Sequence, residues 1–341
     1  MTEEFEQSLA EISFEEVLRA LADESEPFPA RLLYRLSGLD GEELTQMADT
    51  WALVSEQRRL GLLEDMEMLA EANTVLQFDA IARLALDDEE EAVRVVAIRS
   101  LWLSEQTDLA KRFREMLETD PSPAVRAQAA AGLGRFVYLG ELGKIPDDLS
   151  NQIVDRLLAL MDEGVEELIR RRALESLGYS EREAVAERIQ DAYEYGDEEW
   201  QASALFAMGR SADDRWGALV LERLDDQNPD LAKEAAKAAG ELELNEAIPT
   251  LMELLHDEEA EVRFTAAWAL SQIGGSEASA ALEDLLERSE DEDEMDLIEN
   301  ALENLSLTNE INDLTLLDLS EEDLEAAIKS PDEDEDEDLG L

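Results

Sequence analysis

The sequence predicts an all-α protein: a right-handed α-α superhelix, or solenoid, of about six to seven stacked helical hairpins with a helical N-terminal cap. Three observations support this fold class. One frame of residues recurs six times between Asp88 and Ser271, its copies start 32, 44, 31, 31 and 31 residues apart, and no segment has the pattern of a strand. Repeats of this length are typical of solenoids, in which each unit packs only on its neighbours.

Each copy of the frame is predicted to be the second helix of a hairpin. It opens on an apolar residue, has an alanine four positions later, and has a small and then an apolar residue at positions +7 and +8. These positions form one stripe of an α-helix with about 3.6 residues per turn. The opening residues are Val93, Val125, Ile169, Trp200, Leu231 and Val262, and the alanines are Ala97, Ala129, Ala173, Ala204, Ala235 and Ala266.

The segments between the frames predict the first helices and the turns. Apolar spacing before each frame marks a first helix, as in Leu109, Phe113 and Leu117. A glycine that follows the frame suits a helix end in the left-handed conformation. An aspartate five residues before the frame can accept hydrogen bonds from free amides at a helix start. These aspartates are Asp88, Asp120, Asp226 and Asp257, and the glycines are Gly134, Gly178, Gly209 and Gly240.

The pattern resembles the HEAT-repeat family, in the short form first known from phycobilin lyases. Asp120–Gly134 and Asp257–Gly274 match its aspartate, valine-arginine, alanine and leucine-glycine positions, and the resemblance extends from Phe78 to Leu307. Copies four and five depart from it, since Gln201 and Ala232 replace the arginine. The resemblance implies an armadillo-type fold whose second helices line a concave surface. The family's arginine is present as Arg94, Arg126, Arg170 and Arg263.

The segments that lack the regular frame are predicted to be the ends of the solenoid and an insertion within it. Residues 1–75 are an N-terminal helical cap with breaks at 27–29 and 38–41, and residues 76–307 are the repeats, including a degenerate seventh hairpin with Ile298 in place of the alanine. Residues 308–330 are a short helical segment, and residues 331–341 are an acidic disordered tail. The long step of 44 residues indicates an insertion near 137–150, either a loop or, more simply, a lengthened first helix.

Charge narrows the classes of partner. The 341 residues include 28 Lys plus Arg against 87 Asp plus Glu, a net charge of −59. Such a field repels nucleic acids and anionic membranes and favours a basic protein. Adaptation to high salt would give the same composition, and the sequence leaves both readings open. There is no basic and apolar leader and no apolar run of about 18 residues, so we expect a cytoplasmic protein.

The sequence offers little for catalysis. Cysteine is absent, which excludes thiol chemistry, and the single histidine, His256, cannot form a multi-histidine metal cage. Deoxyhypusine hydroxylase has similar HEAT repeats, but it needs several His-Glu pairs and none occurs here. The carboxylates at 291–294 lack the pattern of a calcium loop, so only diffuse weak cation binding is expected. We therefore expect no enzyme, cofactor or metal, with bilin-lyase-like activity as the alternative from another class.

Positions +2, +3 and +6 of the frame are predicted to face away from the core. Across six copies, these eighteen positions hold five basic and two acidic residues. Aromatic residues accompany the cations, a combination typical of binding hot spots. Packing of the aromatics on adjacent repeats and pairing of the cations with glutamates is the competing interpretation. The predicted partner-binding residues are Phe206, Lys233, Lys237, Phe264, Trp268, Arg171, Arg172 and Arg99.

We therefore predict a non-catalytic scaffold or adaptor that binds a protein or peptide through this face. An alternative is an acidic chaperone or escort that holds a basic client on its outer surface, a complex that salt should weaken steeply. A further hypothesis is that the acids at 332–338 fold back onto the basic inner positions and compete with an acidic partner.

Overall fold

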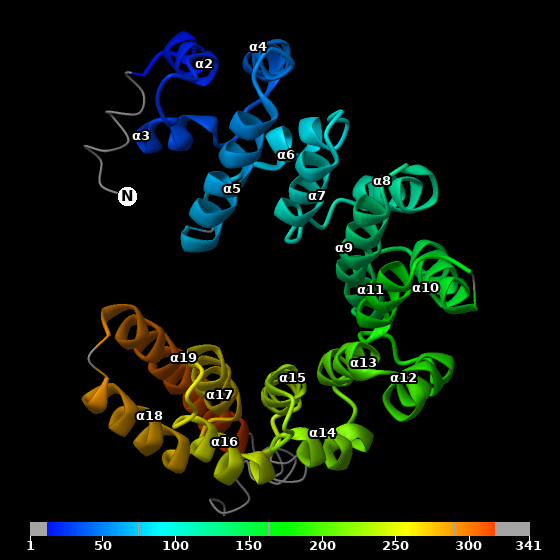
Figure 1. Ribbon diagram of the computed structural model, residues 1–341, viewed down its shortest axis with the longest axis vertical. Coiled ribbons are helices and arrows are strands. Elements are labelled where there is room, and N and C mark those ends of the chain that lie inside the picture. The colour runs from blue at the N-terminus through cyan, green and yellow to red at the C-terminus, as the bar shows by residue number, and fades with distance from the viewer. Residues whose placement is uncertain (1–11, 74, 163, 290, 318–341) are drawn as a thin grey trace, which may run out of the picture. The chain divides into compact units, whose positions relative to one another are not determined.

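The computed structural model describes residues 12–73, 75–162, 164–289 and 291–317 (Figure 1). All regular elements in these ranges are helices, which confirms the predicted all-α class. The chain divides into two compact units, Met1–Ala207 and Met208–Leu341, and the division falls inside helix α13. None of the helices in the described ranges is long and apolar enough to cross a membrane.

The first unit begins with helices that lack the frame. Gly38 and Gly41 have φ values of +69° and +47°, which glycine adopts without strain, so the chain turns where a break is predicted. Helix α5 packs against α7 and α4 packs against α6, so α4 and α5 cover the first repeat as a hairpin of their own. The elements are α2 (Phe14–Ala22), α3 (Ala30–Leu33), the 3-10 turn η1 (Tyr34–Leu36), α4 (Gly41–Trp51), α5 (Glu56–Ala72), α6 (Asp79–Ala85) and α7 (Glu91–Ser100).

Three further hairpins complete this unit. Of their second helices, α9 packs on α7 and α11 packs on α9, and the first helices α8, α10 and α12 lie on the opposite side (Figure 1). Each second helix begins within a few residues of the predicted start. The elements are α8 (Thr107–Thr119), α9 (Pro123–Glu141), α10 (Asp147–Asp162), α11 (Glu167–Leu177), α12 (Glu183–Tyr195) and α13 (Glu198–Arg210).

The insertion near 137–150 lengthens two helices. Helix α9 has 19 residues and α10 has 16, whereas α8 and α12 have 13 each. Residues 137–141 are the last turn of α9, so the longest extension belongs to a second helix and not to a first helix or a loop. Val137 and Leu139 are completely buried there, which explains why the helix continues.

The second unit repeats the arrangement. Its second helices α15, α17 and α19 pack side by side, and α18 and α19 form the degenerate seventh hairpin with Ile298 fully buried. Helix α19 continues through residues 307 and 308, where the sequence predicts a boundary, and the predictions for residues 318–341 lie outside the described part. The elements are η2 (Asp214–Trp216), α14 (Gly217–Arg223), α15 (Pro229–Glu241), η3 (Asn245–Ala247), α16 (Ile248–Leu254), α17 (Ala260–Ile273), α18 (Ser276–Arg288) and α19 (Glu292–Leu317).

The glycines after the frame have a packing role. Gly178 has helical backbone angles, and Gly240 lies within α15, so neither adopts the left-handed conformation predicted for it. A Cβ atom on Gly178 would lie 2.7 Å from the Ala207 carbonyl oxygen, and one on Gly240 would lie 2.8 Å from the Ala269 Cα. The missing side chains therefore let neighbouring second helices approach to backbone contact.

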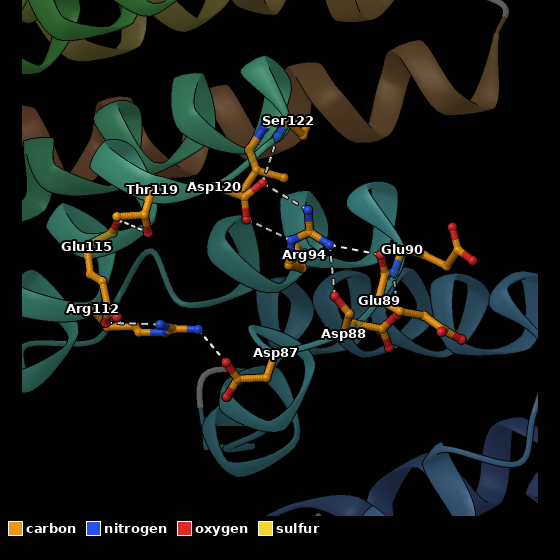
Figure 2. Close-up of polar contacts among 11 residues, drawn as sticks. Asp87, Asp88, Glu89, Glu90, Arg94, Arg112, Glu115, Thr119, Asp120 and Ser122 are labelled. Atoms are coloured by element: carbon orange, nitrogen blue, oxygen red, sulfur yellow. Dashed lines mark hydrogen bonds and ion pairs between the residues drawn. The ribbon is translucent and has the colours of Figure 1, made fainter.

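The aspartates and arginines of the frame join successive hairpins, as Figure 2 shows for the first two copies. Asp120 accepts a hydrogen bond from the Ser122 amide at 2.9 Å, but Ser122 itself is the N-cap of α9, and its hydroxyl accepts from the Val125 amide at 3.4 Å. Arg94 donates through Nε and Nη2 to Asp120, both at 2.9 Å, and through Nη1 to the Asp88 carbonyl at 2.8 Å. One arginine thus fixes its own turn and binds the turn of the next hairpin.

The same contacts extend beyond these copies. In the cap, Arg59 of α5 lies 3.3 Å from Asp88, which also accepts a hydrogen bond from Trp51 Nε1 at 2.7 Å. In the second unit, Arg263 binds the Asp257 carbonyl at 3.0 Å and the Glu294 carboxylate at 2.8 Å. The cap and the degenerate hairpin are therefore attached by the chemistry that joins the regular repeats.

Candidate functional site

The eighteen positions predicted to face away from the core are less exposed than expected. Four of them are buried, among them Glu175 at position +6, and only Arg99, Lys237 and Trp268 are exposed. Because alanine and glycine bring successive second helices to backbone contact, each helix also covers part of its neighbour's outward side. The exposed part of this face is therefore small.

The three predicted arginines of the first unit are engaged within the protein. Arg99 donates through Nε and Nη2 to Glu67 of α5, both at 2.6 Å, and these hydrogen bonds raise the pKa of Arg99. Arg171 lies 2.6 Å from Glu199 of α13, and Arg172 pairs with Glu175 one turn along α11. Phe206, also in this unit, is half-buried.

The two lysines of the second unit differ in availability. Lys233 lies 2.9 Å from both Asp230 and Glu261, and hydrogen bonds to these carboxylates raise its pKa strongly. The side chain of Lys233 is only 18% exposed, so it serves mainly to join α15 to α17. Lys237 is exposed and pairs with Glu234 at 2.8 Å.

Three of the predicted residues come together at one pocket in the second unit. This pocket, the α15–α17–α19 pocket, has a volume of about 390 Å³. Trp268 and Leu297 are 49% and 47% exposed at its edge. Its walls are mostly apolar. It is lined by Lys237 and Glu241 of α15, by Phe264, Thr265, Ala267, Trp268 and Gln272 of α17, and by Leu297 and Ala301 of α19.

A polar network fixes α19 against α17 beside this pocket. The Ser271 hydroxyl donates to the Trp268 carbonyl at 2.7 Å and accepts from Asn304 Nδ2 at 3.0 Å. Thr308 donates to the Ser271 carbonyl at 3.0 Å. Because Ser271 is fully buried, these bonds are shielded from water and hold the two helices in one register. Two of the helices that line the pocket, α17 and α19, are therefore joined by hydrogen bonds between their side chains and backbone.

Carboxylates border the pocket on α15. Burial raises the pKa of Glu241, and the charge of Glu234 raises it further, while Arg210 and Lys237 act in the opposite direction. The Glu241 side chain retains exposed surface, but its Oε2 lies close to Gly209, where an added Cβ would be only 2.5 Å from that oxygen. Glu234 Oε2 is buried and has no hydrogen-bond partner.

Sequence reasoning missed Leu297, Ala301, Gln272 and Glu241. A signal for Leu297 was present: counted from Ile298 in the alanine position, Leu297 is the +3 residue of the degenerate seventh copy. Reading the outward positions of that copy would have placed a large apolar residue beside Phe264 and Trp268. Glu241 had no such signal, because it lies past the end of the frame and reaches the pocket from the last residue of α15.

The histidine and the acidic cluster show no metal geometry in the ranges that the structure describes. His256 is exposed in the turn before α17. Among the described residues, no group of three or more His, Asp or Glu side chains is arranged to hold a metal ion.

Stacked hairpins joined through small residues and repeated arginine–aspartate contacts define an α-solenoid protein. The model of the HEAT repeats family matches residues 79–178 and 217–303, more than half of the chain. The chain therefore belongs to the HEAT repeat family. No protein of curated function matches its sequence.

Several solved structures are similar to this chain. YibA from Escherichia coli is 19% identical with a TM-score of 0.39, over 74% of this chain and 97% of YibA. The complex of CpcE and CpcF of phycocyanin lyase from Nostoc sp. PCC7120 is 19% identical with a TM-score of 0.42, over 67% of this chain and 94% of the matched chain. Human deoxyhypusine hydroxylase is 21% identical with a TM-score of 0.30, over 89% and 97%.

Proposed function

We propose that this protein is a scaffold or adaptor without catalytic activity, and that its α15–α17–α19 pocket receives a side chain of a partner protein or peptide. The exposure of Trp268 and Leu297 at one pocket carries this proposal. Contiguous exposed apolar surface is uncommon on soluble proteins and usually marks an interaction site. A tryptophan in a preformed pocket is also the residue type that most often dominates binding energy.

The lining suggests a role for each wall. Trp268 and Phe264 offer aromatic surface from α17, and Leu297 offers aliphatic surface from α19. Lys237 remains exposed enough to contact a partner, whereas Lys233, Arg99, Arg171 and Arg172 would first have to leave their carboxylates. Since the net charge is −59, we propose a protein partner and not a nucleic acid or an anionic membrane.

Affinity capture with matched variants tests this function. The full-length wild type, Trp268→Ala and Leu297→Ser would each be used as bait, and retained proteins would be quantified by mass spectrometry at two KCl concentrations. Leu307→Ser is the matched control, because Leu307 is an exposed leucine of the same helix and does not line the pocket. We expect both pocket variants to lose the same partner, with unchanged helicity, and the control to retain it.

Two outcomes would contradict the proposal. Retention of every partner by both pocket variants would show that the pocket does not bind. Partners that high salt removes equally from all four baits would instead support an escort that holds basic clients on its acidic surface.

A further inference from the structure

We infer that the pocket selects a basic segment of its partner, in which a bulky apolar side chain enters between Trp268 and Leu297 while a neighbouring lysine or arginine pairs with Glu241, the carboxylate of α15 that lines the pocket. This inference rests on the proposed function and adds to it the chemistry of the bound segment.

The first part follows from the shape and lining of the pocket. A volume of about 390 Å³ lies within the size range of pockets that bind small ligands, so one large side chain with its backbone can be accommodated. Seven of the nine lining residues carry no charge, and five of these are apolar or aromatic: Phe264, Ala267, Trp268, Leu297 and Ala301. A bulky apolar side chain would cover the exposed surface of both Trp268 and Leu297.

The second part follows from the order of charges on α15. Glu234, Lys237 and Glu241 succeed one another at spacings of three and four, so they form one row on the helix surface. Lys237 donates to Glu234 Oε1 at 2.8 Å and leaves Glu234 Oε2 buried without a partner. Glu234 is thus engaged within α15, whereas Glu241, at the end of this row, lines the pocket and places a carboxylate at its edge.

The raised pKa of Glu241 also favours a cation of the partner beside the pocket. Burial and Glu234 together raise its pKa, so Arg210 and Lys237 do not fully compensate the loss of water around its carboxylate. A cation from the partner would stabilise the ionised form, while an anion would meet two carboxylates and the field of a molecule at −59. The pocket therefore favours a positive neighbour to the apolar anchor.

Labelled peptides test the two requirements separately. The probe is a fluorescein-labelled Gly-Arg-Arg-Trp-Arg-Arg-Gly peptide, compared with one that has alanine for tryptophan and one that has glutamate for every arginine. Binding to the full-length protein would be measured by fluorescence anisotropy at about 150 mM KCl, where exposed charges are screened beyond about 8 Å. We expect the tryptophan–arginine peptide to bind at least about tenfold more tightly than either comparison peptide, a difference of about 1.4 kcal/mol.

Protein variants then assign each preference to its residues. The preference for tryptophan over alanine should disappear in Trp268→Ala and Leu297→Ser and persist in Leu307→Ser. The preference for arginine over glutamate should fall several-fold in Glu241→Gln, while the preference for tryptophan remains.

Each remaining outcome overturns the inference. Equal binding of the tryptophan and alanine peptides would mean that arginines bind only the acidic surface. Equal binding of the arginine and glutamate peptides would mean that the pocket recognises apolar groups alone, which leaves the proposed function intact. No measurable binding of the tryptophan–arginine peptide at about 1 mM would reject the basic anchor, because even weak pocket ligands are detected at that concentration.

Discussion

Arg94 and Arg112 each form an ion pair with an aspartate, but water reaches the two pairs to different extents (Figure 2). The side chains of Arg94 and Asp120 are 10% and 9% exposed, whereas those of Arg112 and Asp87 are 32% and 76% exposed. Removing one partner of a buried pair leaves an uncompensated charge, while a surface pair contributes little. The two arginines therefore provide a matched comparison on the successive helices α7 and α8.

We predict that Arg94→Ala lowers the free energy of unfolding by about 3 kcal/mol, because it strands Asp120 and frees the Asp88 carbonyl. Arg112→Ala should lower it by less than about 1 kcal/mol. Urea denaturation of both variants, followed by circular dichroism, measures the difference. Equal losses would show that burial of the arginine–aspartate pair does not set its contribution.

Glu241 gives a prediction that depends on pH. Its pKa in the folded protein is raised above the ordinary value of a glutamate, mainly by burial. An acid of this kind favours folding fully below its unfolded pKa and loses that contribution as the pH rises through the folded pKa. Glu241→Gln removes the ionisable group, so the variant should be more stable than the wild type at neutral pH and equally stable near pH 4. Thermal unfolding curves of both proteins, recorded at both pH values, measure this difference. A lower stability of the variant at neutral pH would contradict the assigned desolvation.

For single residues, the sequence predicts which side of a helix a residue occupies, but it does not predict whether that residue is buried or held in an ion pair. Phe264, Trp268 and Lys237 were found because the frame fixes which side of a helix each residue occupies. The frame does not report how closely the next helix approaches, so Glu175 was predicted to face outward although it is buried. Nor can it show that Lys233 is held by Asp230 and Glu261, because one of those carboxylates lies in the following hairpin.

Neighbouring second helices approach closely in this protein where a glycine or alanine leaves no bulky side chain between them. The second helices were predictable because their spacing follows from local sequence alone. The extension of α9 to Glu141 was harder to predict. Val137 and Leu139 continue the apolar pattern of α9, but the same residues could equally begin the following helix. Short helices such as α14 and α16 offer only two turns of pattern each, so their 3-10 leads had no separate signal.

We predict that Gly240→Ala destabilises the protein by about 1–3 kcal/mol, because the new Cβ would lie 2.8 Å from the Ala269 Cα and force α15 and α17 apart. Gly61→Ala in α5 is the control, since a Cβ there meets no atom within 4 Å. Alanine at that helical position should stabilise by about 0.5–1 kcal/mol.

Thermal and urea unfolding of the two glycine variants distinguish packing from helix propensity. We expect the same glycine-to-alanine change to lower the free energy of unfolding at position 240 and to raise it at position 61. If Gly240→Ala were also stabilising, the second helices would have room to spare and the explanation of their close approach would be wrong.

The charge of the whole molecule acts against its compactness. At −59 the acids repel one another across the surface, and many basic groups are already used in ion pairs such as Arg99–Glu67 and Lys233–Glu261. Salt weakens both the repulsion and these pairs. Exposed pairs contribute only about 0–1 kcal/mol each, while unpaired acids far outnumber the bases, so relief of repulsion should be the larger effect.

We therefore predict that the midpoint of thermal unfolding rises when KCl is increased from about 0.1 M to about 1 M, because the Debye length falls from about 10 Å to about 3 Å. The same measurement at about pH 5 is the control. Because the sequence pI is about 4.1, a shift from pH 7 toward about pH 5 protonates part of the carboxylates and reduces the repulsion that salt can screen. The rise with KCl should accordingly be smaller at the lower pH. A midpoint that falls with salt at pH 7 would mean that the ion pairs between hairpins, and not the repulsion among unpaired acids, dominate the electrostatic free energy of this solenoid.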